Sequence, residues 1–303
     1  MNIVLKGIRY LTDKNYRFLH DAQKGRYATL DDETYLKRIY RATMGYELNL
    51  DNPKTFNEKL QWLKIHDRKP VYTQMVDKIE SKKIVSKLIG EKYIIPTLGV
   101  WDTFDDICFD QLPNQFVLKC SHDSGGLVIC RNKQIFDYKV AKKILTSSLK
   151  LNYYTRLREW PYKDVKPRIL AERYLENSIS EGLTDYKVHS FDGKPRVILV
   201  CRNRFNKSGM TEDFYNERWE HLSVSRISHP NSKDGTKKPE ELEEMLSLSR
   251  KIAKDILFVR TDFYIVNHKI FFGEITFFPS SGFKKFIPES FDEIMGSWLK
   301  LPL

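Results

Sequence analysis

Two short segments late in the chain combine carboxylates with an arginine at strand spacing. In VRTDF, residues 259–263, Arg260 and Asp262 share one face of an expected strand, because side chains alternate along a strand. In FGEITF, residues 272–277, Glu274 and Thr276 share a face in the same way. Oxygen ligands of this kind suit Mg²⁺ or Mn²⁺ bound together with substrate phosphates. The alternative is a hairpin with one carboxylate in solvent and the other paired with an arginine.

The turn between these two segments decides whether the carboxylates meet. A two-residue turn at Asn267–His268 would set Asp262 opposite Gly273, so that the two carboxylates would point to opposite faces. A three- or five-residue loop would set Asp262 opposite Glu274, with Cβ atoms about 5 Å apart. Two anions at that distance repel each other unless a cation lies between them. The sequence leaves both registers open.

A third segment, QFVLKCSHDSGG at residues 115–126, combines a lysine with glycines. A strand is expected to end near Lys119, and a loop with Ser121, Ser124, Gly125 and Gly126 follows it. Glycines let backbone N–H groups turn toward an anion, and the lysine adds a charge beside them. The segment could cover a phosphate, although it matches neither of the two common glycine-rich nucleotide motifs. A Gly-Gly turn that only joins two strands is the alternative.

The elements that must position these residues begin with helices. Apolar residues at helical spacing predict a helix over 31–44. Thr55 with Glu58 three residues later forms a capping-box pattern at the start of the next helix. A further helix is expected over roughly 74–89, with Gly90 placed to end it.

Strand signals dominate from about residue 92. Asp192–Gly193 and Asn267–His268 each separate two alternating runs, which predicts two hairpins. Helices are expected over 137–150 and from Pro239 onward, whereas 206–238 is polar and irregular. Helices first and mixed elements afterwards indicate an α+β protein. The expected strands lie in the runs YIIPTLGVW, QFVLKC, GLVIC, RILAERYLE, DYKVHSF, PRVILVCRNR, FVRTDFYIV and KIFFGEITFF.

Composition limits the class of protein. With 303 residues, 41% hydrophobic and 30% charged, the chain is no disordered polymer, coiled coil or collagen. A net charge of +11 favours polyanionic partners without choosing among them, and the scattered basic residues do not predict nucleic-acid binding. Four cysteines without C-x-x-C spacing are typical of reduced thiols in a cytoplasmic protein. The sequence contains no run of 18 apolar residues, so it predicts no membrane span.

The first residues, MNIVLKGIRYL, leave two interpretations open. Lys6 and Arg9 interrupt the apolar run that a secretory signal would need. A short helix packed against the body of the protein is the favoured interpretation. The alternative is an amphipathic helix that rests on a membrane surface, at the inner face of the membrane.

Read in chain order, these segments resemble the ATP-grasp superfamily, and within it the TupA-like branch of the teichuronopeptide-biosynthesis type. The resemblance extends from NPKTFNEKLQWLK at 52–64 to FFPSSGF at 277–283. It implies an α+β, ATP-grasp fold in which two α/β subdomains clamp ATP after a mainly helical N-terminal region. The implied boundaries are 1–107 for the helical region, 108–178 for the subdomain with the glycine-rich flap and 179–303 for the catalytic subdomain.

The resemblance also implies which residues bind ATP. Lys78 of the Asp77–Lys78 pair and Lys119 would contact the phosphates. The flap would be formed by His122, Ser124, Gly125 and Gly126, the adenine hinge by Glu172, Arg173, Tyr174 and Leu175, and the ribose contact by Asp185, with Lys187 two residues on.

The metal and catalytic residues follow from the same resemblance. Asp262, Glu274 and Thr276 would hold Mg²⁺, or Mn²⁺, and Arg260 would stabilise the transferring phosphoryl group. Thr276 stands where the superfamily usually has Asn. Its hydroxyl is still an oxygen ligand, so one magnesium ion is expected and a second one is less expected. Arg202 and Arg204 are expected to grip a carboxylate substrate. The segment from Pro279 to Gly282 resembles the loop that holds the acyl group.

The activity that this resemblance implies is ligation of a carboxylate to an amine, with ATP consumed and ADP produced. The expected substrates are a uronic acid of a capsular or other surface polysaccharide and a small amine such as an amino acid. A peripheral association with the membrane or with capsule enzymes is a further expectation. Two alternatives remain, a glycosyltransferase of polysaccharide biosynthesis and a non-catalytic ATP-binding scaffold.

Overall fold

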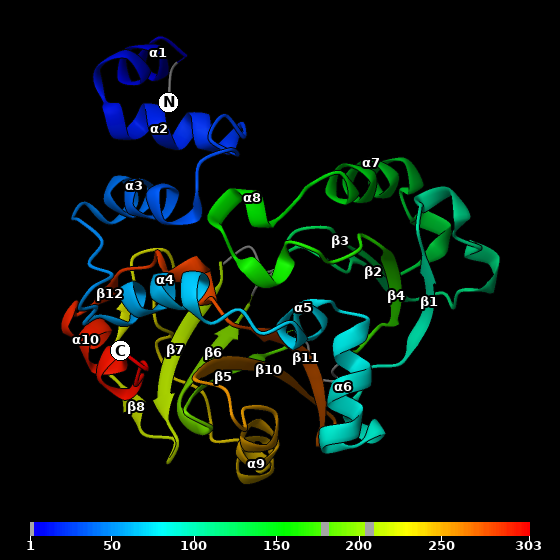
Figure 1. Cartoon of the computed structure of the whole chain (residues 1–303). Coiled ribbons are helices and arrows are strands. Elements are labelled where there is room, and N and C mark those ends of the chain that lie inside the picture. Colours follow the sequence, from blue (N-terminus) through cyan, green and yellow to red (C-terminus); the bar gives the residue numbers. More distant parts are fainter. Residues whose placement is uncertain (1–2, 177–181, 204–208) are drawn as a thin grey trace.

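The computed structural model describes residues 3–176, 182–203 and 209–303 (Figure 1). Two antiparallel sheets form its centre, a smaller one with the strand order β1-β4-β2-β3 and a larger one with the order β11-β10-β5-β6-β7-β8. A short pair, β12-β9, lies beside the larger sheet. The strands are β1 (Thr97–Trp101), β2 (Phe116–Cys120), β3 (Leu127–Cys130), β4 (Ile169–Arg173), β5 (Asp185–Phe191), β6 (Lys194–Arg202), β7 (Thr211–Asn216), β8 (His221–Leu222), β9 (Ser225–Arg226), β10 (Phe258–Val266), β11 (Lys269–Thr276) and β12 (Phe286–Ile287).

Helices precede, connect and follow the sheets, as the α+β pattern predicts. They are α1 (Ile3–Thr12), α2 (Lys14–Gln23), α3 (Asp32–Met44), α4 (Phe56–His66), α5 (Val71–Val76), α6 (Glu80–Ile89), α7 (Tyr138–Leu149), α8 (Tyr154–Leu157), α9 (Leu242–Ile252) and α10 (Ser290–Trp298). The helical N-terminal region, both predicted hairpins and the strands of both sheets up to β6 agree with the sequence. The boundaries at 107 and 178 stay predictions, although β1, which precedes the first of them, belongs to the smaller sheet.

The helix expected over 74–89 is wrong in one respect, because the structure divides it into α5 and α6. The break lies at Asp77, whose backbone is extended, with φ −66° and ψ 117°. One oxygen of Asp77 accepts a hydrogen bond from the backbone N–H of Ile79 at 2.8 Å, and the other accepts from Arg168 at 3.0 Å. An aspartate that bonds a nearby backbone N–H competes with the helix. The break sets Lys78 beside the glycine-rich loop.

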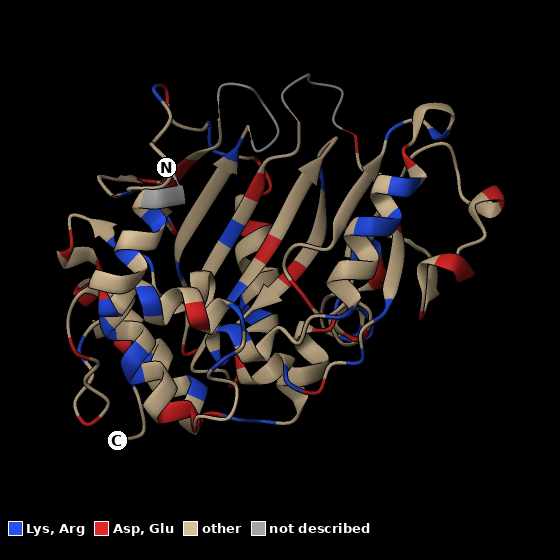
Figure 2. Ribbon diagram, turned by 90° about the horizontal axis from the view of Figure 1, so that it is seen from above, with Lys and Arg blue, Asp and Glu red and all other residues tan. Residues whose placement is uncertain are grey.

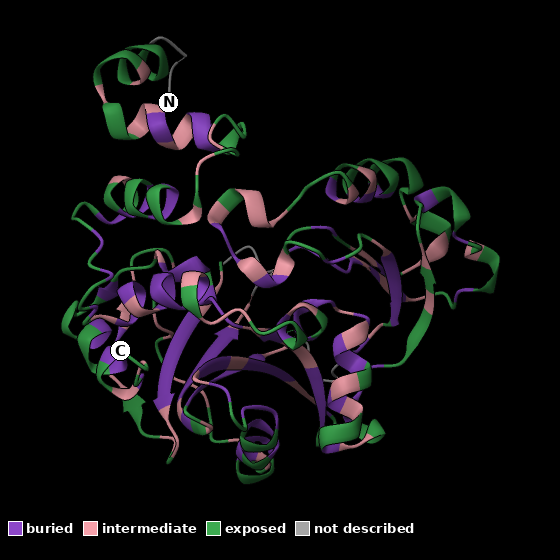
Figure 3. Ribbon diagram, in the orientation of Figure 1, coloured by how far each residue is buried: buried purple, intermediate pink, exposed green. Residues whose placement is uncertain are grey.

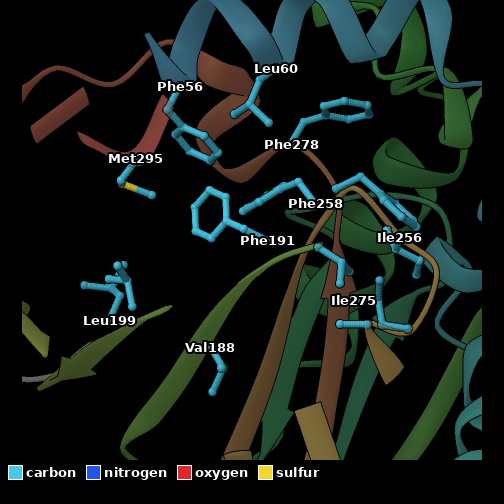
Figure 4. Packing of buried hydrophobic residues seen from close by; sticks show 14 of the residues in the cluster. Phe56, Leu60, Val188, Phe191, Leu199, Ile256, Phe258, Ile275, Phe278 and Met295 are labelled. Atoms are coloured by element: carbon cyan, nitrogen blue, oxygen red, sulfur yellow. The ribbon is translucent and has the colours of Figure 1, made fainter. Parts of the chain in front are cut away.

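The N-terminal helices differ in how closely they join the body. The capping box at the start of α4 is present, with the Thr55 and Glu58 side chains both bonded to the backbone. Below α4, Phe56 packs on Phe258 of the larger sheet with ring centroids 4.8 Å apart (Figure 4). In contrast, α1 packs on α2, and both stand apart from the sheets in Figure 1. Figure 3 shows the outer surface of α1 as exposed.

The two faces of the larger sheet have different neighbours. Helix α9 packs against β5, β6 and β10, and the Ser249 hydroxyl of α9 bonds that of Thr261 at 2.7 Å. Side chains alternate along β10, so Asp262 lies on the face away from α9.

No helix of the described ranges, which omit 1–2, 177–181 and 204–208, is both long and apolar enough to cross a bilayer.

Replacement of Gly296 by alanine is expected to destabilise the fold. A Cβ atom at this position of α10 would lie 2.1 Å from the carbonyl oxygen of Lys54 and 2.9 Å from the backbone nitrogen of Phe56. Because backbone atoms cannot move aside cheaply, Gly296→Ala should lower the free energy of unfolding by about 2 kcal/mol in urea titrations. Gly7→Ala in α1 is the matched control, since a Cβ there meets nothing within 4 Å and should cause no loss.

Candidate active site

The β10–β11 hairpin brings Asp262 and Glu274 to opposite positions through a bulge. Its turn has two residues, Asn267 and His268, both with positive φ. Phe263 pairs with Phe272, but the register then shifts, and Asp262 pairs with Glu274. Gly273 is the extra residue of this bulge. The two-residue turn alone would have separated the carboxylates, and the bulge reverses that outcome.

Glycine fits the bulge because the surrounding space is small. A Cβ atom on Gly273 would lie 3.1 Å from the Tyr264 ring and 3.2 Å from the carbonyl oxygen of Asp262. Both distances are shorter than ordinary van der Waals contacts. A larger residue would press on the backbone of Asp262 itself, so the glycine and the position of the carboxylate are linked.

Two cations hold the Asp262 carboxylate, which is only 2% exposed. Arg260 donates to both oxygens, at 2.6 Å and 2.7 Å, and also reaches Glu274 at 3.1 Å. Lys187 of β5 donates to Asp262 from the neighbouring strand. Burial alone would raise the pKa of Asp262, but attraction to Arg260 and Lys187 outweighs burial and lowers the pKa to about 2. The group is therefore an anion at neutral pH.

The donors around this pair suit a divalent metal ion. Glu274 has a side chain that is 41% exposed, and one of its oxygens accepts from Arg260. Thr276 pairs with Arg260 and shares the face of Glu274. Mg²⁺ in nucleotide sites is held by one or two carboxylates together with phosphates and waters. Among the residues that the structure describes, no cluster of three or more His, Cys, Asp or Glu gathers around one point, so substrate oxygens would have to complete such a site.

The same face of the larger sheet carries further charges. Asp185 lies two residues before Lys187 on β5, with 3.8 Å between its carboxylate and the lysine nitrogen. Asp185 pairs with Cys201, and Cys201 pairs with Glu212, so Glu212 shares this face. Arg226 of β9 lies 3.6 Å from Glu212. Figure 2 looks down on this face and shows acidic and basic residues interleaved along the central strands.

Arg202, one of the two arginines that were expected to grip a carboxylate, is not brought to this face. Arg202 follows Cys201 and therefore points to the opposite face, where it donates to the carbonyl oxygen of Gly235 at 2.8 Å. Arg204 lies outside the described residues. The role given to each stays a prediction. Arg226, which the sequence did not single out, lies 3.6 Å from Glu212 on this face instead. Burial, and then the positive charges of Arg260 and Arg226, lower the pKa of the buried His189 to about 3.

The smaller sheet supplies a second buried carboxylate between two cations. Glu172 of β4 is 4% exposed in its side chain, and its two oxygens lie 2.5 Å from Lys119 of β2 and 2.5 Å from Lys82 of α6. Burial would raise the pKa of Glu172, but the two lysines outweigh burial and lower the pKa. Lys82 was not predicted as a site residue, since only its helical spacing was visible in the sequence.

The glycine-rich loop joins β2 to β3 next to Lys78. The Lys78 ammonium donates to the carbonyl oxygen of Asp123, and the Asp123 carboxylate accepts from the backbone N–H of Gly126 at 3.1 Å. Ser124 and Gly125 are exposed. His122 is buried, and its ring bonds to the carbonyl oxygen of Leu151 at 3.1 Å. The ring therefore points toward the C-terminal end of α7.

The expected adenine hinge lies where the two sheets meet. Leu175 packs in an apolar cluster with Val266 and Phe271 of the β10–β11 hairpin. The Arg173 guanidinium lies 5.9 Å from the Phe271 ring centroid. Tyr174, which lies between Arg173 and Leu175 in the sequence, is half-buried. The segment therefore links the sheet that carries Glu172 to the sheet that carries Asp262.

A third polar cluster anchors the loop that follows β11. The backbone of Ser280 and Ser281 has positive φ, and the Ser281 hydroxyl donates to the buried Glu159. Lys64 of α4, fully buried, donates to the carbonyl oxygen of Ser281 at 2.9 Å. Burial lowers the pKa of Lys64 and raises that of Glu159, and each charge partly offsets the effect on the other. Such a cluster has no local motif by which the sequence could reveal it.

Comparison with known families agrees with this geometry. A family model described as TupA-like ATPgrasp matches residues 58–300. The chain belongs to the TupA-like ATP-grasp family. No curated protein matches the sequence.

Several solved structures resemble parts of this TupA-like protein. D-alanine–D-alanine ligase from Bacillus anthracis, complexed with ATP, is 18% identical with a TM-score of 0.38 over 67% of this chain and 53% of its own. The corresponding ligase from Helicobacter pylori is 16% identical with a TM-score of 0.40 over 75% and 59%. N5-carboxyaminoimidazole synthase from Aspergillus clavatus, with ADP and 5-aminoimidazole ribonucleotide, is 13% identical with a TM-score of 0.36 over 67% and 44%. The chain spans less than two thirds of the length of each.

The stability contributed by Glu172 is expected to depend on pH. Glu172→Gln leaves two buried lysines without their anion and should lower the free energy of unfolding by about 3 kcal/mol at pH 7. Because the folded pKa of Glu172 lies below its unfolded value of 4.5, the wild type loses this contribution as the pH falls below that value. The difference in free energy of unfolding between the wild type and Glu172→Gln, measured in urea titrations, should therefore be largest at pH 7 and should decrease below pH 4.5. A gap that stayed constant with pH would contradict the ion pairing.

Proposed function

We propose that this protein is an ATP-dependent ligase that joins a carboxylate to an amine through an acyl phosphate. Family membership supports the use of ATP. The observation that carries the proposal is the pairing of Asp262 with Glu274 beside Arg260, on the face of the larger sheet that also carries Lys187. Two facing carboxylates with an arginine between them match a site where phosphates and a divalent ion meet.

The reaction has two steps that balance without a redox partner. A carboxylate oxygen of the substrate attacks the γ-phosphorus of ATP, the bond to the β–γ bridging oxygen breaks, and ADP leaves. The product is an acyl phosphate. The amine nitrogen then attacks the acyl carbon, the carbon–oxygen bond to phosphate breaks, and the nitrogen loses its proton as the amide forms.

The charges at this site explain why a metal ion suits this reaction. Among the described residues, the charged side chains that contact one another at this site are four carboxylates, Asp185, Glu212, Asp262 and Glu274, and three cations, Lys187, Arg226 and Arg260. This face alone would repel a triphosphate. Mg²⁺ held by Asp262 and Glu274 would supply positive charge beside the phosphates. Arg260 would stabilise the charge that spreads over the transferring phosphoryl group, and Lys78 and Lys119 would hold the phosphates from the flap side.

Arg226 is the best-placed residue to bind the carboxylate substrate. Its side chain is 9% exposed, and its Nε–H group has no acceptor among the described residues. A guanidinium with a free donor can bind a carboxylate with two parallel hydrogen bonds. Two ring faces support it, because Arg226 stacks 5.5 Å from the centroids of Phe214 and Phe286.

The substrate class that we propose is a uronic acid of a surface polysaccharide or its precursor, with an amino acid or related amine as the second substrate. The resemblance to teichuronopeptide-type proteins supports this choice. Arg226 and the basic net charge of +11 are compatible with an anionic sugar but do not select one.

Asp262→Asn is the direct test of the ligase proposal. ADP release is measured with Mg·ATP, a uronic acid and a panel of amino acids. The variant should lose activity by about 100-fold, because a carboxylate that neutralises the phosphates through the metal ion is replaced by an amide. Asp110 is an exposed aspartate between β1 and β2. Its replacement, Asp110→Asn, is the matched control and should retain full activity.

The controls also separate the rival functions. Thermal unfolding is measured first, to establish that Asp262→Asn is folded. Turnover of a nucleotide sugar without ADP release would favour a glycosyltransferase. Nucleotide binding without turnover over the whole panel would favour a scaffold, and undiminished ADP release by the variant would overturn the metal assignment.

A further inference from the structure

Helix α1 presents an apolar stripe to solvent. Leu5, Ile8 and Leu11 are 57%, 53% and 74% exposed, and their spacing places them on one side of the helix. The other side of α1 contacts α2, where the Tyr10 hydroxyl donates to Asp21 at 3.0 Å. The helix is therefore held by α2 along one side and has its apolar side free. Packing against the body, the interpretation favoured from the sequence, does not cover these three side chains.

Basic residues surround this stripe. Residues 3–26 contain six Lys and Arg but only two Asp. Arg9 and Arg26 pair with these aspartates, whereas Lys6, Lys14 and Lys24, all exposed, have no carboxylate within 4 Å in the described chain. The two-helix segment that carries the apolar stripe thus has uncompensated positive charge.

We propose that α1 binds the surface of an anionic membrane. Leu5, Ile8 and Leu11 would enter the boundary between headgroups and acyl chains, and Lys6 would contact lipid phosphates. The position of α1 away from both sheets, visible in Figure 1, would let the helix lie flat while the candidate site stays open. A second copy of the chain is less suited to this face, because it would bring two sets of unpaired lysines together.

Cosedimentation of the full chain with lipid vesicles tests the proposal. The probes are vesicles of phosphatidylcholine alone and of phosphatidylcholine mixed with phosphatidylglycerol, each at low and high salt. The wild type should bind the anionic vesicles, and high salt should weaken binding. Leu5→Asp with Ile8→Asp should reduce binding by about tenfold or more, and Lys6→Gln by about fivefold.

Matched variants and alternative outcomes make the test decisive. The double variant Ile135→Asp with Val140→Asp changes two other exposed apolar residues, and Lys139→Gln changes another exposed lysine. Neither control variant should affect binding to the vesicles. Equal binding to neutral and anionic vesicles, or no binding by the wild type, would overturn the proposal. Self-association that the Leu5 and Ile8 changes abolish, without vesicle binding, would assign the face to a second copy instead.

A separate observation concerns Lys82, whose ammonium group is fully occupied. It lies 2.5 Å from Glu172 and donates to the Ile95 carbonyl oxygen at 2.8 Å and the Thr97 hydroxyl at 3.0 Å. Lys119, in contrast, has Glu172 as its partner and keeps 15% of its side chain exposed. Burial of Lys82 lowers its pKa, and Glu172 offsets this effect.

We infer that Lys82 is a positioning residue for nucleotide binding, an inference that rests on the proposed function. Glu172, Lys82 and Lys119 together carry one net positive charge. Without Lys82, Glu172 would neutralise Lys119, and the phosphates would meet no net charge at this lysine. Lys82 therefore acts through Glu172 and never touches the nucleotide.

A charge-balance experiment distinguishes this role from a purely structural one. The probe is ADP, measured by isothermal titration calorimetry. Lys82→Met should weaken ADP binding by about tenfold, whereas Lys82→Arg should bind like the wild type. Glu172 was expected in the adenine hinge, but both oxygens of its side chain contact lysines, so the substitution removes charge and no contact to adenine. The double variant Lys82→Met with Glu172→Gln restores one net charge and should recover to within about threefold. A structural role would predict a further loss in the double variant.

The outcomes separate this inference from the proposed function. If the wild type does not bind ADP, the proposed function fails. If the wild type binds ADP and Lys82→Met binds it equally well, or the double variant shows no recovery while thermal unfolding confirms that it is folded, the role of Lys82 is overturned and nucleotide binding stands.

Discussion

Each sheet contributes a buried carboxylate that is held between two cations, and the candidate site is built around these two groups. Asp262 lies between Arg260 and Lys187 in the larger sheet, and Glu172 lies between Lys82 and Lys119 in the smaller one. Removing an ion from water costs several kcal/mol, and only close partners repay that cost. Each anion is therefore fixed in place by its neighbours before any ligand arrives. The Glu172 group retains one positive charge, whereas the Asp262 group shares its two cations with Glu274 and Asp185. Neither group has to rearrange its own charges to receive phosphates, and under the proposed function a metal ion would supply the positive charge at Asp262.

The arrangement of the rest of the fold serves the relative position of these two centres. The hinge residues Arg173 to Leu175 run from the strand that carries Glu172 into the apolar cluster formed by Val266 and Phe271. The break at Asp77 sets Lys78 at the glycine-rich loop, and Arg168 ties that break to the start of β4. Short stretches of backbone thus connect Glu172, the hinge residues and the glycine-rich loop. A displacement of one sheet would therefore change the distance between Glu172 and Asp262.

The sequence predicted those features that depend on local chemistry. Thr55 with Glu58, Asp192–Gly193 and Asn267–His268 each act within a few residues, and the structure confirms the helix start and both hairpins. Features that depend on distant partners were not visible. Strand β7 was missed because its buried Glu212 and Asp213 make the segment as polar as a loop, and their partners come from elsewhere in the chain. The same reason hid Lys82 and Arg226, whose significance appears only when β4 and β7 lie beside them.

The register of the β10–β11 hairpin shows how a small backbone change controls a functional site. Turn length alone separates Asp262 from Glu274, yet a single extra residue, Gly273, inverts the alternation and returns both carboxylates to one face. The loop after β11 continues this control, because the positive φ values at Ser280 and Ser281 are held by Glu159 and by Lys64 of α4. A helix far from the hairpin in sequence therefore fixes the backbone on the far side of Thr276. The helical N-terminal region is in this sense part of the site, because the buried lysine of α4 helps Glu159 to hold the loop at one end of the strand that carries Glu274, while the two-residue turn fixes the other end.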